Sequence, residues 1–342
     1  MNPVPGPLAL RARSCTTGYR TRARDLARLE PQRAEVAYII GGLYGNLEAL
    51  DAIEELAARE TAAGGPAPLL CFNGDFHWFD ASPEWFAEIQ RRVLVHRPCL
   101  GNVEMELADP QPGAGCGCNY PRSVPEDTVS RSDAIMARLQ RLVHDHSLDV
   151  SVLRPLPRQL RVEVGPLRVG VVHGDPDNIA GWGLELAAMP PPGSLSATLE
   201  TWFDEADVDV LASSHTCRCF AQAFPGSRAV FNNGAAGMPN FTGDHRIVIT
   251  RIARRPPTLP AGSEVLYARD FGSITVSALA LPWDRETFLR RFDRVWPAGS
   301  PAAQSYRQRI RRGPPHIREE AKRLAPSADQ RILAKAAAIS RR

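Results

Sequence analysis

The stretch from Leu69 to Asp80 constrains this chain most, because an apolar run there stops abruptly at polar residues. Four apolar residues are typical of a buried strand, and Asn73-Gly74 ends them directly before Asp75. Ligands of open α/β sheets bind outside the carboxyl ends of the strands, so a carboxylate at this position is a candidate ligand. Asn-Gly-Asp is also an ordinary turn, and Asp75 therefore needs support from elsewhere in the chain.

The composition predicts a globular protein with a full hydrophobic core. The chain has 342 residues, of which 44% are hydrophobic and 23% are charged, enough for one large domain or two. A net charge of +3 is too small to predict a nucleic-acid partner. Apolar runs fall short of the roughly 20 residues that a membrane span needs, so we expect no membrane partner and a cytoplasmic location.

Charge and periodicity divide the chain into three parts. Residues 1–34 hold seven arginines among prolines and small residues, which predicts a solvated basic arm. Residues 35–297 alternate predicted strands and helices, as in an α/β domain. Residues 298–342 predict a basic helical extension, with Ser300-Pro301 and Ser327 as helix starts. Neither the role of this extension nor the oligomeric state follows from the sequence.

Polar segments follow four of the predicted strands. Each segment alone has a structural explanation, such as a turn or a helix start. Because ligands of such sheets gather at the carboxyl ends of the strands, we expect the four segments to converge at one edge. The segments are Gly74-Asp75, Gly101-Asn102-x-Glu104, His173-Gly174 and Ser214-His215-Thr216-Cys217.

These ordered motifs resemble those of the calcineurin-like metallophosphoesterases over roughly residues 36–281. The resemblance implies an α/β fold of two packed mixed β-sheets flanked by helices, and hydrolysis of phosphate esters with paired metal ions. It makes Asp75 a bridging carboxylate, and Asn102, His173 and His215 the remaining ligands of one metal. Such ligands suit a divalent Mn, Fe or Zn ion. The implied partner is a phosphorylated small-molecule substrate or ligand.

The chain departs from the family pattern at the other metal. The family begins with Asp-x-His, whereas the matching residues here are Gly42-Leu43-Tyr44. Its final Gly-His-x-His becomes Ser214-His215-Thr216-Cys217, so the last imidazole is a thiol. A histidine that often follows the motif asparagine, and protonates the leaving group, is replaced by Val103.

Three interpretations follow from these departures. In the first, the protein is a phosphoric ester hydrolase with one firmly bound metal, in which His77 or Tyr44 replaces the lost acid and Glu104 is a further candidate catalytic residue. In the second, hydrolysis has been lost and the fold binds a metal or a phosphorylated ligand. In the third, Cys217 and the Cys116-Gly117-Cys118 pair rebuild a second site for a softer metal.

The seven cysteines favour thiols or metal ligands over a disulfide framework, because the chain is long and shows no export signal. Cys71 and Cys99 fall in apolar strands and predict core thiols. Cys217 stands where the family's final histidine reaches its metal, which makes it a candidate metal ligand. The alternative is an inert thiol that fills the space of the lost ligand.

Overall fold

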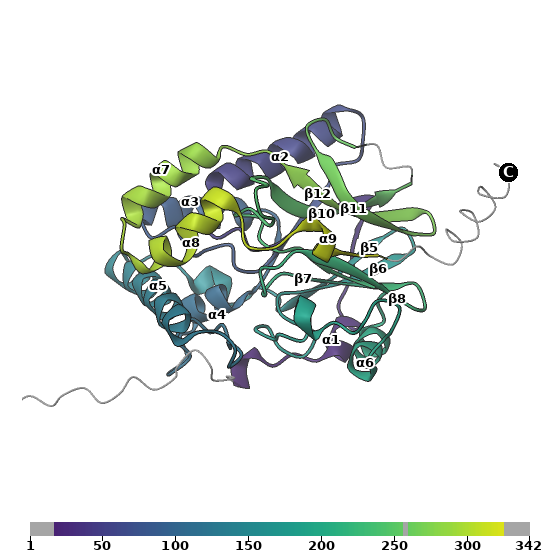
Figure 1. Ribbon diagram of the computed structural model, residues 1–342, viewed down its shortest axis with the longest axis horizontal. Helices are drawn as coiled ribbons and strands as arrows, with labels where there is room; N and C mark the ends of the chain where they lie inside the picture. The colour runs from purple at the N-terminus through teal and green to yellow at the C-terminus, as the bar shows by residue number, and fades with distance from the viewer. Residues whose placement is uncertain (1–16, 256–258, 325–342) are drawn as a thin grey trace, which may run out of the picture.

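Two mixed β-sheets lie face to face in this protein, and helices cover their outer faces (Figure 1). The computed structural model describes residues 17–255 and 259–324. Beyond the last long strand, the described chain is largely helical. This arrangement confirms the predicted fold class, an α/β sandwich of two mixed sheets with a helical C-terminal region.

The six-stranded sheet places the strand that precedes Asp75 in its parallel half. Its order is β11-β12-β10-β2-β3-β4. Here β2, β3 and β4 run parallel to one another, and β10 pairs antiparallel with β2. The three parallel strands therefore end at one edge. The strands are β2 (Val36–Ile40), β3 (Leu69–Asn73), β4 (Arg97–Cys99), β10 (Ile247–Arg254), β11 (Glu264–Phe271) and β12 (Ile274–Leu281).

The seven-stranded sheet has the order β1-β5-β6-β7-β9-β8-β13. Its central strands β6, β7 and β9 are parallel, and the predicted hairpin is the antiparallel pair β5 and β6. The strands are β1 (Gln32–Ala34), β5 (Gln159–Val164), β6 (Leu167–Val172), β7 (Val210–Ser213), β8 (Phe220–Phe224), β9 (Arg228–Asn232) and β13 (Lys322–Arg323).

Helices flank both sheets. In Figure 1, α2 and α7 lie beyond the six-stranded sheet, and α1 and α6 lie beyond the seven-stranded sheet. The α-helices are α1 (Ala23–Leu26), α2 (Leu47–Ala62), α3 (Pro83–Val93), α4 (Asn102–Ala108), α5 (Glu126–Asp145), α6 (Ala197–Ala206), α7 (Arg285–Val295), α8 (Pro301–Arg312) and α9 (Arg318–Ala321). Short 3₁₀ turns are η1 (Thr17–Tyr19), η2 (Ser151–Leu153) and η3 (Leu186–Ala188). Within the described ranges, none of the helices has the length and apolar character that a membrane crossing requires.

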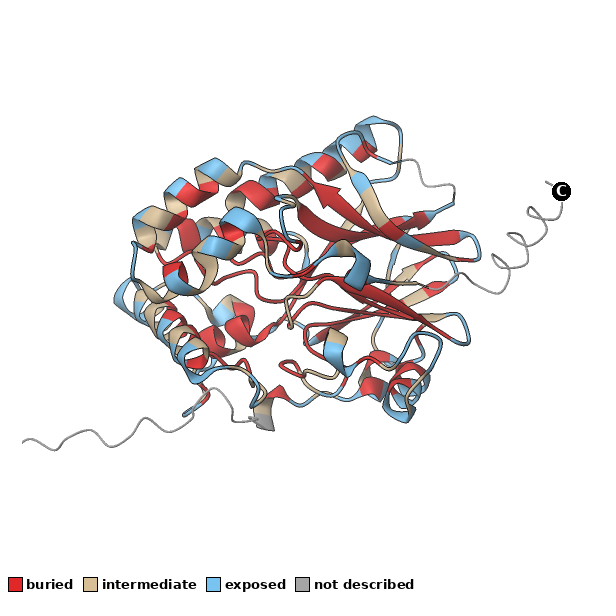
Figure 2. Ribbon diagram, in the orientation of Figure 1, coloured by how far each residue is buried: buried red, intermediate tan, exposed pale blue. Residues whose placement is uncertain are grey.

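Strand β2 is buried on both faces, which explains why all five of its residues are apolar. Tyr38 and Ile40 join the core beneath α2, α3, α5 and α7. Ala37 and Ile39 join the core that includes residues of both sheets. This alternation is expected for a strand between two hydrophobic layers. Figure 2 shows the same burial along the central strands.

Residues 17–34 differ from the predicted solvated arm. Strand β1 pairs in parallel with β5 at the edge of the seven-stranded sheet, and Tyr19 and Leu26 are buried. The Tyr19 hydroxyl donates a hydrogen bond to Glu106 on α4. The arginines dominate the composition of this segment, and the apolar residues between them are what pack. Residues 1–16 of the predicted arm lie outside the described residues.

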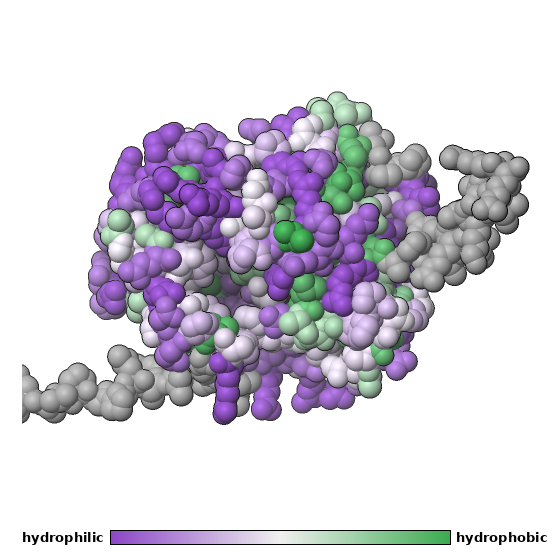
Figure 3. All heavy atoms as spheres, in the orientation of Figure 1, coloured by the Kyte–Doolittle hydropathy of each residue, from purple (hydrophilic) through white to green (hydrophobic). Residues whose placement is uncertain are grey.

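Helix α8 has a capped start and is bonded to the rest of the domain along its length. The Ser300 side chain accepts a hydrogen bond from the Ala303 N–H, as the predicted helix start requires. Arg131 on α5 donates to the Ser305 hydroxyl at 2.7 Å. The surface over neighbouring α7 is largely hydrophilic (Figure 3). Ser327 lies outside the described residues, and the boundaries 34/35 and 297/298 stay a prediction.

Candidate metal centre

The four polar segments meet where their strands end. Asp75 follows β3, Asn102 begins α4 after β4, and His173 follows β6. His215 lies two residues beyond the end of β7. The carboxyl ends of parallel strands from both sheets therefore supply one side chain each.

The turn between β3 and Asp75 explains the glycine of the first motif. Gly74 has φ 74° and Asp75 has φ 53°, so both residues lie in the left-handed region. A Cβ atom on Gly74 would lie 2.6 Å from both the Gly101 Cα and the His173 Nδ1. Glycine alone fits this close approach. The turn aims the Asp75 carboxylate back toward His173.

The side chains converge around one nitrogen, His173 Nε2. It lies 3.2 Å from Asp75 Oδ2, 3.2 Å from Asn102 Oδ1 and 3.1 Å from His215 Nδ1. All four side chains are buried. Asp75, His173 and His215 are also the described group whose ligand atoms lie within 4.8 Å of one another. The structure therefore brings together the side chains that we expected to converge, those of Asp75, Asn102, His173 and His215.

Hydrogen bonds on the far side of each group fix which atom faces the centre. His173 Nδ1 lies 2.8 Å from the Asn73 carbonyl oxygen, and His215 Nε2 lies 3.0 Å from the Cys118 carbonyl oxygen. We assign the proton of each neutral ring to these nitrogens, because a carbonyl can only accept. The Asn102 amide donates to the Cys116 carbonyl oxygen at 2.9 Å. Lone pairs of all four groups therefore point inward.

Four inward lone pairs need a positive charge among them. Burial alone would lower the pKa of His173, but the Asp75 carboxylate outweighs it and raises that pKa above its ordinary value. Burial likewise opposes ionisation of Asp75, yet His173 holds the pKa of that carboxyl below its usual range. Burial, and then His173, lower the pKa of His215 to about 3. The imidazole, amide and carboxylate groups of this site are ligands that suit a divalent cation.

The carboxylate of Glu104, a candidate catalytic residue, binds backbone N–H groups instead. It accepts hydrogen bonds from the N–H groups of Gly101, Asp75, Phe76 and His77 at 2.8 to 3.2 Å. Burial, and then the charge of Asp75, raise its pKa. These four bonds hold the loop after β3, so the contribution of Glu104 is to the position of Asp75.

His77, the second candidate catalytic residue, faces away from the cavity. Its Nδ1 lies 2.6 Å from Asp80 Oδ2, and its ring stacks on Phe86 with centroids 3.9 Å apart. The side chain is fully buried and is not among the residues that line the cavity beside Asp75. The sequence could not show this, since His77 is only two residues from Asp75.

Tyr44 and Cys217 pair with each other beside the four acceptors. The Tyr44 hydroxyl lies 2.7 Å from Cys217 Sγ. A Cβ on Gly42 would lie 2.4 Å from Tyr44 Cζ, so the tyrosine ring fills the space in which the family's first carboxylate would begin. Burial raises the pKa of the Tyr44 phenol well above its ordinary value and also raises that of the Cys217 thiol. Cys217 lines the cavity without joining the cluster around His173.

One cysteine pair differs from the prediction of free thiols or metal ligands, whereas Cys217 and Cys219 are free. Cys116 and Cys118 are joined in a disulfide, so they offer no thiolate to a metal. Cys219 points away from the cavity, and its sulfur lies 2.9 Å from the Tyr267 hydroxyl. Residues two apart in an extended segment would share a face, but Cys217 has φ 54°, so the chain turns between Cys217 and Cys219. Cys71 and Cys99 are buried, as predicted.

A small cavity of about 170 Å³ opens beside the four acceptors. Tyr306 and Arg309 on α8 line this cavity, and the sequence analysis did not single them out. A signal existed, because Ala302, Tyr306, Arg309 and Ile310 repeat at helical spacing. The lining residues are Tyr44, Asp75, Trp78, Asn102, Val103, Cys118, Tyr120, Trp182, His215, Thr216, Cys217, Tyr306 and Arg309.

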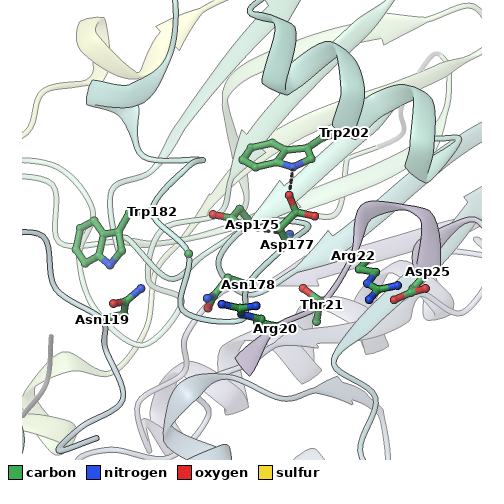
Figure 4. Close-up of a pocket in the computed structure, with 11 residues that line it drawn as sticks. Arg20, Thr21, Arg22, Asp25, Asn119, Asp175, Asp177, Asn178, Trp182 and Trp202 are labelled. Carbon is green, nitrogen blue, oxygen red and sulfur yellow. Dashed lines mark hydrogen bonds between the residues drawn. The ribbon is translucent and has the colours of Figure 1, made fainter. Parts of the chain in front are cut away.

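A larger and more open cavity, of about 740 Å³, adjoins the first through Trp182 (Figure 4). The Trp182 indole donates to the Cys118 carbonyl oxygen at 3.1 Å. Figure 4 shows Trp202 donating to Asp177, with Arg20 across the opening. Opposite charges are mixed along its walls, and it lacks the converging acceptors of the smaller cavity.

The comparison with solved structures found proteins of similar architecture. A metallophosphoesterase from Sphaerobacter thermophilus is 17% identical, with a TM-score of 0.47 over 82% of this chain and 100% of that one. Vps29 of Chaetomium thermophilum is 15% identical, with a TM-score of 0.32 over 72% and 96%. Vps29 of Entamoeba histolytica, solved with Zn²⁺, is 12% identical, with a TM-score of 0.32 over 72% and 98%.

The chain resembles proteins of the metallophosphoesterase fold. The sequence motifs point to the same fold. Neither the family models nor the curated proteins include a match to this sequence. The chemistry of the site follows from its own geometry.

Proposed function

We propose that the protein is a metal-dependent phosphoric ester hydrolase that works with one divalent cation, Mn, Fe or Zn. The observation that carries the proposal is the convergence of four acceptor atoms in a buried site next to a cavity. These acceptors are carboxylate, amide oxygen and neutral imidazole, which suit such metals. The ligands would be Asp75, Asn102, His173 and His215.

A cation held there would act as a Lewis acid on a phosphoryl oxygen and lower the pKa of a water molecule. The protein's own part is to hold its ligands in place before the ester arrives. Carbonyl oxygens of Asn73 and Cys118 orient the two imidazoles, and Glu104 fixes the loop that carries Asp75. Such rigid support is what a metal site needs for a reproducible geometry.

We assign protonation of the leaving group to Tyr44. Of the three candidate catalytic residues it lines the cavity, whereas His77 and Glu104 do not. The phenol is protonated at neutral pH, as tyrosine ordinarily is, so it can donate a hydrogen bond to the oxygen on which charge develops. The Tyr44 hydroxyl bonds to Cys217 Sγ before the ester binds. That hydrogen bond would break when the ester enters and form again when the product leaves.

The test uses the full chain, loaded with Mn²⁺, and two generic substrates, p-nitrophenyl phosphate and bis(p-nitrophenyl) phosphate. We expect metal-dependent release of p-nitrophenol that disappears in His215→Ala. His144→Ala is the matched control, because His144 is exposed at the end of α5. A protein that keeps its metal and turns over neither substrate, nor any in a broad phosphoester panel, is not this hydrolase.

The Tyr44 ring also favours a second function, a fold that binds metal and a phosphorylated ligand without hydrolysis. Paired metals stabilise both the attacking and the leaving oxygen in two-metal sites. Tyr44 fills the space beside Gly42, so the second cation's place is taken by a phenol. Bound metal and bound inorganic phosphate, together with no turnover, would support this second function.

A further inference from the structure

Arg309 brings a partly buried cation to the wall of the small cavity. Its Nη2 donates to the Cys217 carbonyl oxygen at 2.8 Å. Its Nε is buried and makes no hydrogen bond to any described residue. A buried guanidinium N–H without an acceptor is costly, so its presence in a cavity wall points to an acceptor that arrives with a ligand.

The helix that carries Arg309 is held rigidly enough to place it. Ala302 and Ile310 on the same helix are fully buried, and Arg131 bonds to Ser305. Arg309 is thereby held at the cavity opposite the strand ends that bear the four acceptors. A binding group on a fixed helix is positioned more precisely than one on a loop.

The charges of the cavity wall favour a dianion. Asp75 and Arg309 are its two ionised side chains of opposite sign, and they cancel. Tyr44 is buried and Tyr120 and Tyr306 are partly buried, and all three phenols stay neutral because burial raises their pKa. A divalent cation among the four acceptors would leave this wall with two positive charges in excess. A phosphomonoester, with two negative charges, neutralises them, whereas a diester neutralises one.

The size of the cavity favours a small occupant. Its volume of about 170 Å³ lies below the roughly 300–1,000 Å³ of typical ligand pockets. A phosphoryl group fits such a volume. The organic part of a substrate would extend past Trp182, the side chain that borders the larger cavity.

We propose that Arg309 binds the phosphoryl group of a phosphomonoester dianion, with its buried Nε–H donating to a phosphoryl oxygen. This inference rests on the proposed function and names its substrate class. Arg309 is a binding residue in this account. It comes from the C-terminal helical region, whereas the metal ligands follow the ends of strands. Planar guanidinium donors match phosphate oxygens better than a lysine does.

The test measures binding of inorganic phosphate to the Mn²⁺-loaded full chain by isothermal titration calorimetry at pH 8. Arg309→Met should retain one metal per chain and bind phosphate roughly 10- to 100-fold more weakly, the usual effect of losing a charge-assisted hydrogen bond. Arg312→Met is the matched control, since Arg312 is exposed on the same helix, and it should bind as the parent does. Dimethyl phosphate, a monoanion, should bind the parent at least roughly tenfold more weakly than phosphate.

Equal phosphate affinity in Arg309→Met and Arg312→Met would overturn the role of Arg309 while leaving the proposed hydrolase intact. Equal affinity for phosphate and dimethyl phosphate would overturn the monoester assignment. A full chain that takes up no metal would overturn the proposed function, and this inference with it. Arg309→Gln, which keeps a donor for the Cys217 carbonyl, gives the same comparison if circular dichroism shows Arg309→Met to be unfolded.

Discussion

The two sides of the small cavity bury polar groups in opposite ways. On the acceptor side, formed by Asp75, Asn102, His173 and His215, four lone pairs face one another and none of these groups satisfies the others without a positive charge. On the tyrosine side, formed by Gly42, Tyr44 and Cys217, a hydroxyl and a thiol satisfy each other at 2.7 Å. The first side requires a positive charge, which a bound cation would supply, and the second is complete without one.

The contrast teaches that a missing metal ligand can be replaced by packing. The Tyr44 ring occupies the space that a side chain on Gly42 would need. The ring also contacts the aromatic core, with the Phe79 centroid 6.1 Å away. The tyrosine side therefore gains hydrophobic burial where a second ion would have needed charged ligands.

The largest effect should come from His173→Ala, which removes the nitrogen at the centre of the acceptor side. We expect metal affinity to fall at least about 100-fold, since loss of a mere supporting partner costs 10- to 100-fold. Hydrolysis should fall with it, and the far-ultraviolet circular dichroism should not change. Metal content measured by mass spectrometry decides this, and unchanged content in His173→Ala would contradict the acceptor-side account.

Tyr44→Phe should separate the two sides. It removes the hydroxyl and keeps the ring, so the metal stoichiometry should stay the same while kcat falls roughly 100-fold, the lower range of general acid catalysis. KM should change little. If kcat is unaltered in a metal-replete variant, Tyr44 fills space and takes no part in the proton transfer.

The Gly42 position tests whether the tyrosine side is a filled metal site. Gly42→Asp alone should destabilise the fold by about 1–3 kcal/mol, because its Cβ would overlap the Tyr44 ring. Combining it with Tyr44→His should recover part of this loss and raise the bound Mn or Zn from one ion per chain to two. A folded double variant that still binds one ion would show that these residues cannot rebuild the second site.

Cys217→Ser should have the smallest effect. The serine hydroxyl can keep the hydrogen bond to Tyr44, and we expect metal affinity to change less than about twofold. Cobalt-loaded protein should show no sulfur-to-metal charge-transfer band in the near ultraviolet, because the thiol pairs with a phenol. Such a band, abolished by the serine, would instead make Cys217 a metal ligand.

Sequence patterns could predict the acceptor side because each of its residues follows a strand closely. The strand bounds at Asn73, Cys99 and Val172 precede Asp75, Asn102 and His173 by two, three and one residues. Carboxyl ends of parallel strands share an edge, so local signals were enough to predict the convergence.

The other residues depend on tertiary packing that local patterns do not encode. Arg309 is one of several arginines on α8, and its direction is set by how that helix packs on α5. Cys116 and Cys118 lie close enough to form a disulfide because Gly117 between them has φ 69°. His77 turns away because its ring stacks on Phe86. Each outcome depends on a neighbour distant in the chain or on a backbone angle.

Metal content per chain is the most direct test of the central claim, that one side of the cavity binds a divalent cation and the other side does not. The full chain would be incubated with Mn²⁺, Fe²⁺ or Zn²⁺, desalted, and measured by inductively coupled plasma mass spectrometry against protein concentration. The account predicts one tightly held ion per chain. No retained ion would contradict the acceptor side, and two retained ions would contradict the closure of the tyrosine side by Tyr44 and Cys217.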